Sequence, residues 1–473
     1  LQNVAVGAEQ ITLAGGTLTD VTSSLAGDVI LTANSNLGAT NAGDTFTLSG
    51  VISGGYAITK IGAGRVVLSG ANTYSGNTTV SAGTLSVAGS LNDATAVTVA
   101  SGATYDVAAS DTIASLAGAG NVTLNSNTLT VGGTTNTTYS GVMSGTGSLL
   151  KAGTATFTMS GANTYTGGTT INAGTLALDA NDVLADTGAL NVAGGTFAMG
   201  AYNDTVGSVS ITGGQVTGTG NLTGASYGFS NTSGTVTIST VIAGNVGITK
   251  TGAGTLVLSA ANTYTGTTTV TEGTLVVTNS AGLGSTAGGT TVSAGATLDL
   301  QNVAVGAEQI TLAGGTLTDV TSSLAGNVIL TADSHFGATN VGDTFTLSGV
   351  ISGNYAITKI GAGTVILSGA NTYTGTTTIS TGTLSVTGSL NDVTAVTVAS
   401  GATYNLGASD TIASLAGAGN VTLNGNTLTV GGNTNTTYSG VMSGAGSLVK
   451  AGTATFTMSG ANTYTGGTTI NAG

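Results

Sequence analysis

Apolar residues recur at every second position in short runs along the whole chain. Between residues 97 and 131 the apolar pairs are Val97/Val99, Tyr105/Val107, Val122/Leu124 and Leu129/Val131, with Ile113/Leu116 more loosely spaced. A period of two places alternate side chains on opposite faces of an extended strand. The pattern therefore predicts short strands throughout, each with one buried and one exposed face.

Small residues separate these runs, as at 100–102, 117–120 and 125–127. Glycine and asparagine tolerate the positive φ that sharp corners require, and no helical period of useful length is present. Short, evenly spaced strands favour a parallel β-helix (solenoid) with three strands and roughly 22–25 residues per coil, hence about 20 coils. A series of β-sandwiches or barrels is the alternative, but it needs hairpins and linkers that the sequence does not show.

The chain contains a long internal duplication. Residues 1–174 return as residues 300–473 at a constant offset of 299, and 21 of the 174 paired positions differ, without insertion or deletion. Such self-similarity is typical of a repeat architecture. We expect residues 1–299 to form one full tandem unit and 300–473 a partial second copy, without a globular domain. We also expect the chain to be part of a longer array.

Composition supports an ordered, acidic fibre. The chain has 80 glycines, no proline, no cysteine and only 5% charged residues, against roughly 25% in average soluble domains. With 40% hydrophobic residues it has enough apolar side chains for a core, so order is favoured over disorder. The net charge of −13 opposes binding to nucleic acid or anionic membranes.

A cassette of about 26 residues recurs five times and begins in its first copy at Lys60, continuing to Leu85. Each copy has a lysine before a glycine-rich turn and then an Asn-Thr-Tyr triplet. Its recurring residues are Lys60, Asn72 and Tyr74; Lys151, Asn163 and Tyr165; Lys250, Asn262 and Tyr264; Lys359, Asn371 and Tyr373; and Lys450, Asn462 and Tyr464. We expect these to be structural residues.

The cassette, with the preceding segment 46–54 and with residues 291–300, resembles the autotransporter-associated β-strand repeat, and the resemblance extends over essentially the whole chain. It implies a right-handed parallel β-helix, exported through an outer-membrane β-barrel and displayed extracellularly on the surface of a Gram-negative bacterium. The implied role is adhesion, surface coating or filament formation, with the chain itself as a partner in an end-to-end or continuous fibre. An enzyme is not implied.

The five lysines admit two interpretations. As a regular row they could bind anionic glycans of host or neighbouring cells, which makes a glycan-binding solenoid the alternative function. As structural residues they would be solvent-facing charges or would cap backbone carbonyls. One lysine per ~90–110 residues amid excess acid favours the structural interpretation.

Asp179, Asp182 and Asp186 form the densest acidic cluster and are the candidates for a calcium site. Hard cations need several converging oxygens, but the spacing is not that of an EF-hand. A solvated insertion loop is therefore the favoured interpretation, with no cofactor and no metal.

The sequence does not show the sets of residues that the considered kinds of catalysis need. Ser226 lies in a Gly-x-Ser-x-Gly match, which needs a strand–turn–helix context and a histidine base, but the only histidine, His335, replaces Asn36 of the first copy. A polysaccharide lyase needs clustered carboxylates and a strong base, yet the single arginine, Arg65, is replaced by Thr364. Ice binding through Thr-x-Thr pairs, as at 128–130, is a further alternative, but the motif does not recur in every coil.

Overall fold

The computed structural model describes all residues 1–473 and contains sixty strands and no helix. The strands form a parallel β-solenoid of about 23 turns, which confirms the predicted fold class. The turns are shorter than the predicted 22–25 residues. In β10 (Arg65–Leu68), β12 (Thr84–Val87) and β14 (Thr104–Val107), Arg65 pairs with Thr84 and Thr84 with Thr104, which gives steps of 19 and 20 residues. Strands of three or four residues joined by tight corners account for the difference.

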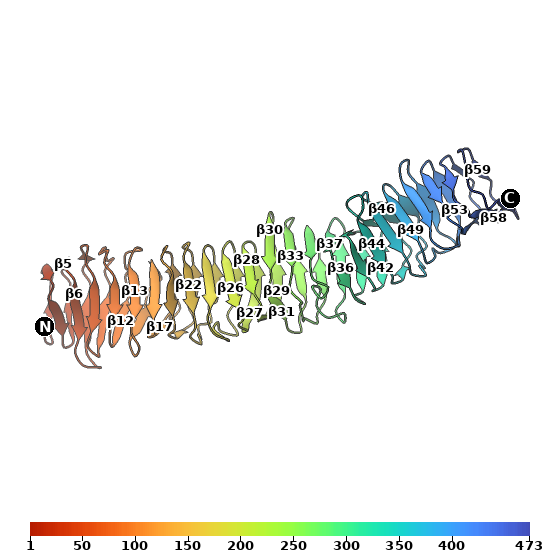
Figure 1. The fold of residues 1–473 in the computed structure, drawn as a ribbon. Helices are drawn as coiled ribbons and strands as arrows, with labels where there is room; N and C mark the ends of the chain where they lie inside the picture. The colour runs from red at the N-terminus through yellow and green to blue at the C-terminus, as the bar shows by residue number, and fades with distance from the viewer. The chain divides into compact units, whose positions relative to one another are not determined.

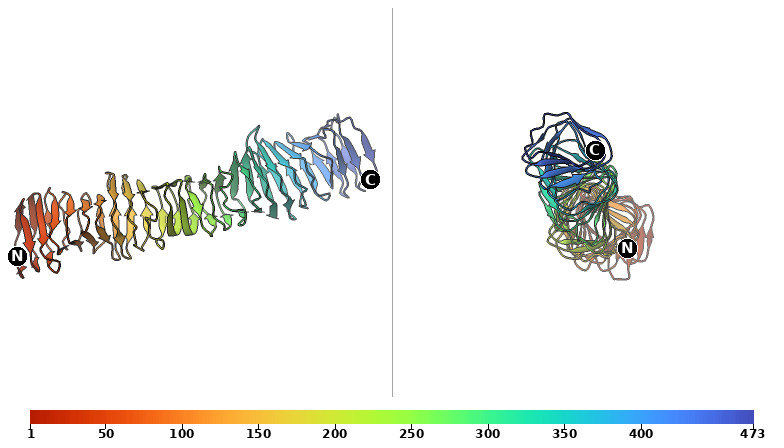
Figure 2. Two further views of the ribbon diagram at one scale, coloured as in Figure 1. Left: turned by 60° about the horizontal axis from the view of Figure 1, so that its bottom comes forward. Right: turned by 90° about the vertical axis from the view of Figure 1, so that its right-hand side faces the viewer.

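The chain forms two compact units. The first comprises Leu1–Tyr227 with Ser239–Val241, and the second comprises Gly228–Ile238 with Ile242–Gly473. Within each unit, strands of successive turns lie side by side and the connecting loops line the edges of the stack (Figures 1 and 2).

Most turns of the first unit place one strand on each of three faces. One such turn consists of β14, β15 (Asp111–Ile113) and β16 (Ser115–Gly118), and the next consists of β17 (Asn121–Thr123), β18 (Thr128–Val131) and β19 (Thr137–Tyr139). Each strand pairs in parallel with the strand three places later in the chain. Backbone N–H and C=O groups are thereby satisfied from turn to turn.

The core consists of apolar side chains that stack in register between turns. On β7 (Thr45–Leu48), β10, β12 and β14, Leu48, Leu68, Val87 and Val107 occupy successive positions of one such stack and are all buried. In the second unit Val107 is replaced by Leu406, which is equally buried on β51 (Thr403–Leu406). A swap between apolar residues of similar size preserves the core at small cost.

The cassette turns have only two strands. β10 is followed by segment 69–77, which carries the Asn-Thr-Tyr triplet, and then by β11 (Thr78–Val80) and β12. The second unit repeats this with β47 (Thr364–Leu367), β48 (Thr377–Ile379) and β49 (Thr383–Val386). On the third face the triplet segment stands where other turns have a strand, and the N–H groups of Thr73 and Ser75 still donate to backbone carbonyls of the preceding turn.

Glycine makes the corners of the cassette possible. Gly83 has φ +60°, and a Cβ atom there would lie 2.4 Å from the carbonyl oxygen of Gly64 in the preceding turn. Gly382 has the same role in the second unit, with φ +63°. Only a residue without a side chain fits such a corner.

Candidate functional site

The five cassette lysines point into the solenoid. They lie on β9 (Ile58–Ile61), β21 (Ser148–Lys151), β32 (Ile248–Lys250), β46 (Ile357–Ile360) and β58 (Ser447–Lys450), and all five are buried. Lys60 Nζ donates to the carbonyl oxygens of Ile61, Gly62 and Ala82 at 2.8–3.0 Å. Equivalent bonds to carbonyl oxygens hold the other four. The lysines thus cap carbonyls and do not face solvent.

Burial also changes how readily these lysines ionise. It lowers the pKa of Lys60 and of Lys359 to about 8, and it lowers the pKa of Lys151 and Lys250 as well. A buried ammonium group without an acidic partner is disfavoured, and the carbonyl dipoles around it compensate in part. No cassette lysine is placed to bind a ligand from solution.

Each cassette asparagine joins its own turn to a neighbouring turn. Asn72 Oδ1 accepts a hydrogen bond from the backbone N–H of Ile52, 3.0 Å away, in the preceding turn. Its Nδ2 donates to the carbonyl oxygens of Gly70 and Ser90, each at 2.9 Å. The equivalent bonds of Asn163, Asn262, Asn371 and Asn462 follow the same plan. The side chain thus supplies an acceptor for the Ile52 N–H, and the backbone N–H groups of Thr73 and Ser75 bond to the same preceding turn.

Each cassette tyrosine bonds to a threonine four residues later. The Tyr74 hydroxyl and Thr78 Oγ1 are 2.6 Å apart, and both residues are buried. The pairs Tyr165–Thr169, Tyr264–Thr268, Tyr373–Thr377 and Tyr464–Thr468 have separations of 2.5–2.6 Å. Burial raises the pKa of Tyr74 and keeps its hydroxyl neutral.

A buried acidic residue follows four of the cassettes and was not predicted from the sequence. These residues are Asp111, Asp204, Glu308 and Asp410. Asp111 accepts from the backbone N–H of Leu91 at 3.1 Å, and Asp410 accepts from that of Leu390 at the same distance. Three of the four begin the pattern Asp-Thr-(Ile/Val)-x-Ser, 37 to 39 residues after the cassette tyrosine. This spacing is the signal that could have identified them.

Burial is the main cause of the unusual ionisation of these carboxyl groups. It raises the pKa of Asp111 and Asp410 to about 6 and that of Asp204 to about 7, with a smaller contribution from nearby acids. The pKa of Glu308 is raised by burial as well. Each carboxyl lies near the buried cassette tyrosine of its own part of the chain.

The predicted calcium candidates do not converge. Asp179 accepts a bond from the Tyr202 hydroxyl at 3.1 Å on the surface, and Asp182 has a positive φ of 52° in a loop. Neither they nor Asp186 belong to any group of three or more potential metal ligands, and no such group occurs elsewhere in the chain.

Ser226 lies exposed within the long strand β29 (Asn221–Phe229). Because the residue is part of an extended strand and not of a strand-to-helix turn, it lacks the geometry of a nucleophile elbow. His335 lies exposed on β43 (Ser334–Gly337), where it pairs in register with Thr316.

The outward faces carry hydroxyl groups in register. In the second unit Thr235, Thr255, Thr274, Thr297 and Thr316 occupy one outward row over five consecutive turns. The row two residues further along holds Thr237, Val257, Val276, Asp299 and Thr318. Thr-x-Thr pairs therefore occur only in the first and last of these turns, which does not give the regular double row expected of an ice-binding face.

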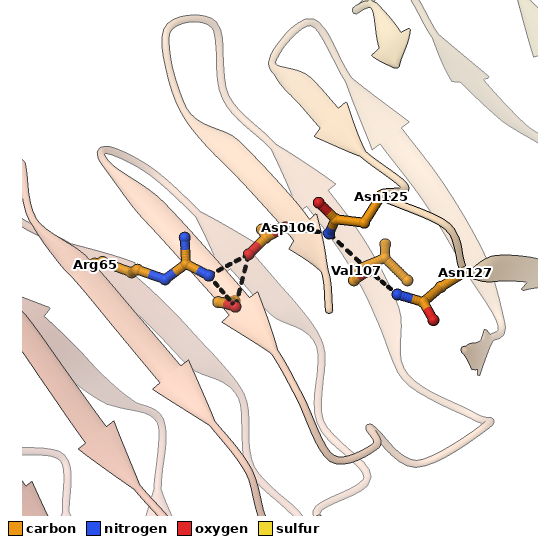
Figure 3. Close-up of polar contacts among 6 residues, drawn as sticks. Arg65, Asp106, Val107, Asn125 and Asn127 are labelled. Carbon is orange, nitrogen blue, oxygen red and sulfur yellow. Dashed lines mark hydrogen bonds and ion pairs between the residues drawn. The ribbon is translucent and has the colours of Figure 1, made fainter. Parts of the chain in front are cut away.

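One outward cluster departs from this neutral surface (Figure 3). Arg65 Nη2 lies 2.5 Å from Asp106 Oδ2 and 2.7 Å from Ser86 Oγ, so the contacts extend over three turns. Ser86 Oγ donates to the same carboxylate oxygen, and Asn125 Nδ2 donates to Asp106 Oδ1 at 2.7 Å. The Arg65–Asp106 contact is the only ion pair in the chain.

The structure contains no helix long and apolar enough to cross a membrane.

The chain contains the passenger-associated-transport-repeat at residues 58–87, 149–178, 248–277, 357–386 and 448–473. Each stretch begins two residues before a cassette lysine. The chain is also similar to the adhesin BmaC autotransporter of Brucella suis biovar 1 (strain 1330), with 39% identity over 345 residues. This match covers 68% of the chain but only 9% of that protein. No solved structure matches the chain. The resemblance to autotransporter-associated repeats is thus confirmed.

We predict that the buried lysines resist modification in the folded chain. With an amine-reactive ester at pH 8, Lys60, Lys151, Lys250 and Lys359 should stay unmodified, because their Nζ atoms are enclosed by backbone, while the exposed amine of Leu1 reacts. Urea-unfolded chain should react at every lysine. Peptide mass spectrometry measures both, and rapid native labelling would refute the enclosed geometry.

We also predict that mild acid stabilises the fold. Unfolded aspartates ionise near pH 4, whereas Asp111, Asp410 and Asp204 do so at about 6 to 7 when folded. Their stabilising contribution is therefore fully present below about pH 4 and is lost as the pH rises through 6 to 7. The lysines, with pKa lowered to about 8, make a contribution to stability that changes with pH only above this range.

Thermal melts at pH 5 and pH 7.5 test this prediction, and the Tm should be higher at pH 5. The double substitution Asp111→Asn/Asp410→Asn should reduce the difference, because asparagine does not ionise. Asp28→Asn, at an exposed position where the second copy has Asn327, is the matched control and should leave it unchanged. A Tm that rises with pH from 5 to 7.5 would contradict the assignment.

Proposed function

We propose that the chain is part of the passenger of an autotransporter adhesin, displayed outside a Gram-negative bacterium, where it acts in adhesion without catalysing a reaction. The observation that carries this proposal is the direction of the cassette side chains. In all five copies the lysine and asparagine bond to the backbone of the solenoid. The repeated residues therefore maintain a scaffold, and recognition is left to the outward faces.

Three features support this role. The passenger-associated-transport-repeats coincide with the turns that carry the cassette lysine, asparagine and tyrosine. The similar Brucella protein is described as an adhesin. The outward faces carry mainly threonine, serine and asparagine, which can form many weak polar contacts over a repeated surface. Ser226, the residue with a nucleophile-elbow sequence match, lies in an extended strand that lacks the geometry of that motif. Repetition of weak contacts strengthens attachment through multivalency.

The net charge of −13 adds a physical reason for surface display. Repulsion between acidic chains keeps neighbouring copies apart and in solution. Because the five lysines are buried, acidic side chains outnumber basic ones on the surface by a larger ratio than in the whole composition.

Adhesion can be measured directly with the purified chain. Beads coated with the folded chain should bind to cultured epithelial cells several-fold more than albumin-coated beads, and soluble chain should compete. Beads coated with heat-unfolded chain are the matched control, because the composition is the same and the ordered surface is lost. Attachment no stronger than that of albumin, at equal coating density, would contradict the proposal.

A further inference from the structure

We propose that the surface hollow around Arg65 binds a saccharide that carries a carboxylate. The hollow has a volume of about 450 Å³ and lies in the first unit. It is lined by Arg65, Thr84, Thr104, Asp106, Ala108, Thr123 and Asn125. This inference rests on the proposed surface role and names a ligand class for one part of that surface.

Charge is the first argument. The chain has six lysines and arginines, and the five lysines are buried on backbone carbonyls. Arg65, whose side chain is 44% exposed, is therefore the one permanently charged cationic side chain that a ligand can reach. An anionic ligand recognised through a side-chain charge must meet the protein at this residue.

Arg65 is also held in place while some of its N–H donors remain unused. Its bonds to Asp106 and Ser86 both use Nη2, and Nη1 and Nε donate to no protein acceptor. A guanidinium has five N–H donors, so three remain. Asp106 is 6% exposed and accepts from Arg65, Ser86 and Asn125, which fixes the arginine before a ligand arrives. Pre-organised guanidinium groups suit planar carboxylates.

The walls of the hollow favour a hydroxyl-rich ligand. Arg65, Thr84 and Thr104 follow one another in register on β10, β12 and β14. Ser86, Asp106 and Thr123 form the adjacent row on β12, β14 and β17. Polar groups thus recur at the strand spacing of about 4.8 Å along both rows. Apart from Ala108 the lining is polar, unlike the apolar pockets that hold most small ligands.

The net charge of the chain further restricts the class of ligand. A polyanion such as a nucleic acid or a polyphosphate would be repelled by a chain of net charge −13. A saccharide with isolated carboxylates among neutral hydroxyl groups places its charge at Arg65 and its hydroxyls against the threonine rows. This combination matches the hollow best.

The second copy supplies a natural control for the site. Arg65 and Asp106 are exchanged together, for Thr364 and Asn405. Asn405 Nδ2 there donates to Ser385 Oγ at 2.9 Å, so the equivalent surface keeps its hydrogen bonds without the charges. Because both pairs occur in this fold, each can be introduced in the place of the other with little risk of unfolding.

The test is a reciprocal exchange between the two copies in the full chain. The probes are 3′-sialyllactose and galacturonic acid, each with a single carboxylate, with lactose as the neutral control, and binding is measured by titration calorimetry or saturation-transfer NMR. The native chain should bind at least one acidic probe. Arg65→Thr/Asp106→Asn should weaken binding about tenfold or more, because a charge-assisted hydrogen bond is lost. Thr364→Arg/Asn405→Asp should gain a second equivalent site.

Circular dichroism melts of both variants verify that each remains folded. Binding of neither acidic probe by the native chain, or undiminished binding by Arg65→Thr/Asp106→Asn, would overturn the proposal, as would equal binding of lactose. The bead assay separates this proposal from the adhesive role. Adhesion that persists without saccharide binding refutes the site alone, and saccharide binding without adhesion refutes the adhesive role alone.

Discussion

The structure depends on one constraint, which is that each turn must satisfy the backbone hydrogen bonds of the turn beside it. Parallel strands do this on most faces, and a chain without proline loses no donor from these ladders. Where a cassette turn has no third strand, the N–H groups of Thr73 and Ser75 still donate to the preceding turn, and the Asn72 side chain bonds to both neighbouring turns. The ammonium group of Lys60 caps the carbonyl oxygens of Ile61, Gly62 and Ala82. A buried polar group left unpaired is costly, so the asparagine recurs in all five cassettes.

This constraint separates scaffold from surface. The cassette lysines and asparagines are polar residues that the sequence alone would first assign to binding. In the structure they point inward and bond to the backbone. The outward faces are then free to vary, and most of the 21 positions that differ between the two copies are not buried. Arg65 and Asp106 are an exception, since they are in contact and are exchanged as a pair. From the sequence, Arg65/Thr364 was interpreted as an outward site that exchanges freely, and the contact with Asp106 becomes visible only in the structure.

The alternating apolar pattern was enough to predict strands, core and parallel stacking, because a period of two determines which side chains are buried. The length of a coil was overestimated, because it depends on how few residues a glycine corner needs. The orientation of Lys60 was left open, since a lysine suits both water and a ring of carbonyls. Asp111 was missed because its partners, Leu91 and Tyr105, lie in other strands or turns.

The asparagine side chain completes the hydrogen bonding of the face that lacks a strand, and hydrogen exchange of Asn72→Ala tests this role most directly. The Ile52 amide, which donates to Asn72 Oδ1, should lose protection, and the turn should be destabilised by about 1–3 kcal/mol. Asn77→Thr, which introduces the residue found at position 376 of the second copy, should leave exchange unchanged. Undiminished protection of the Ile52 amide in Asn72→Ala would contradict the account.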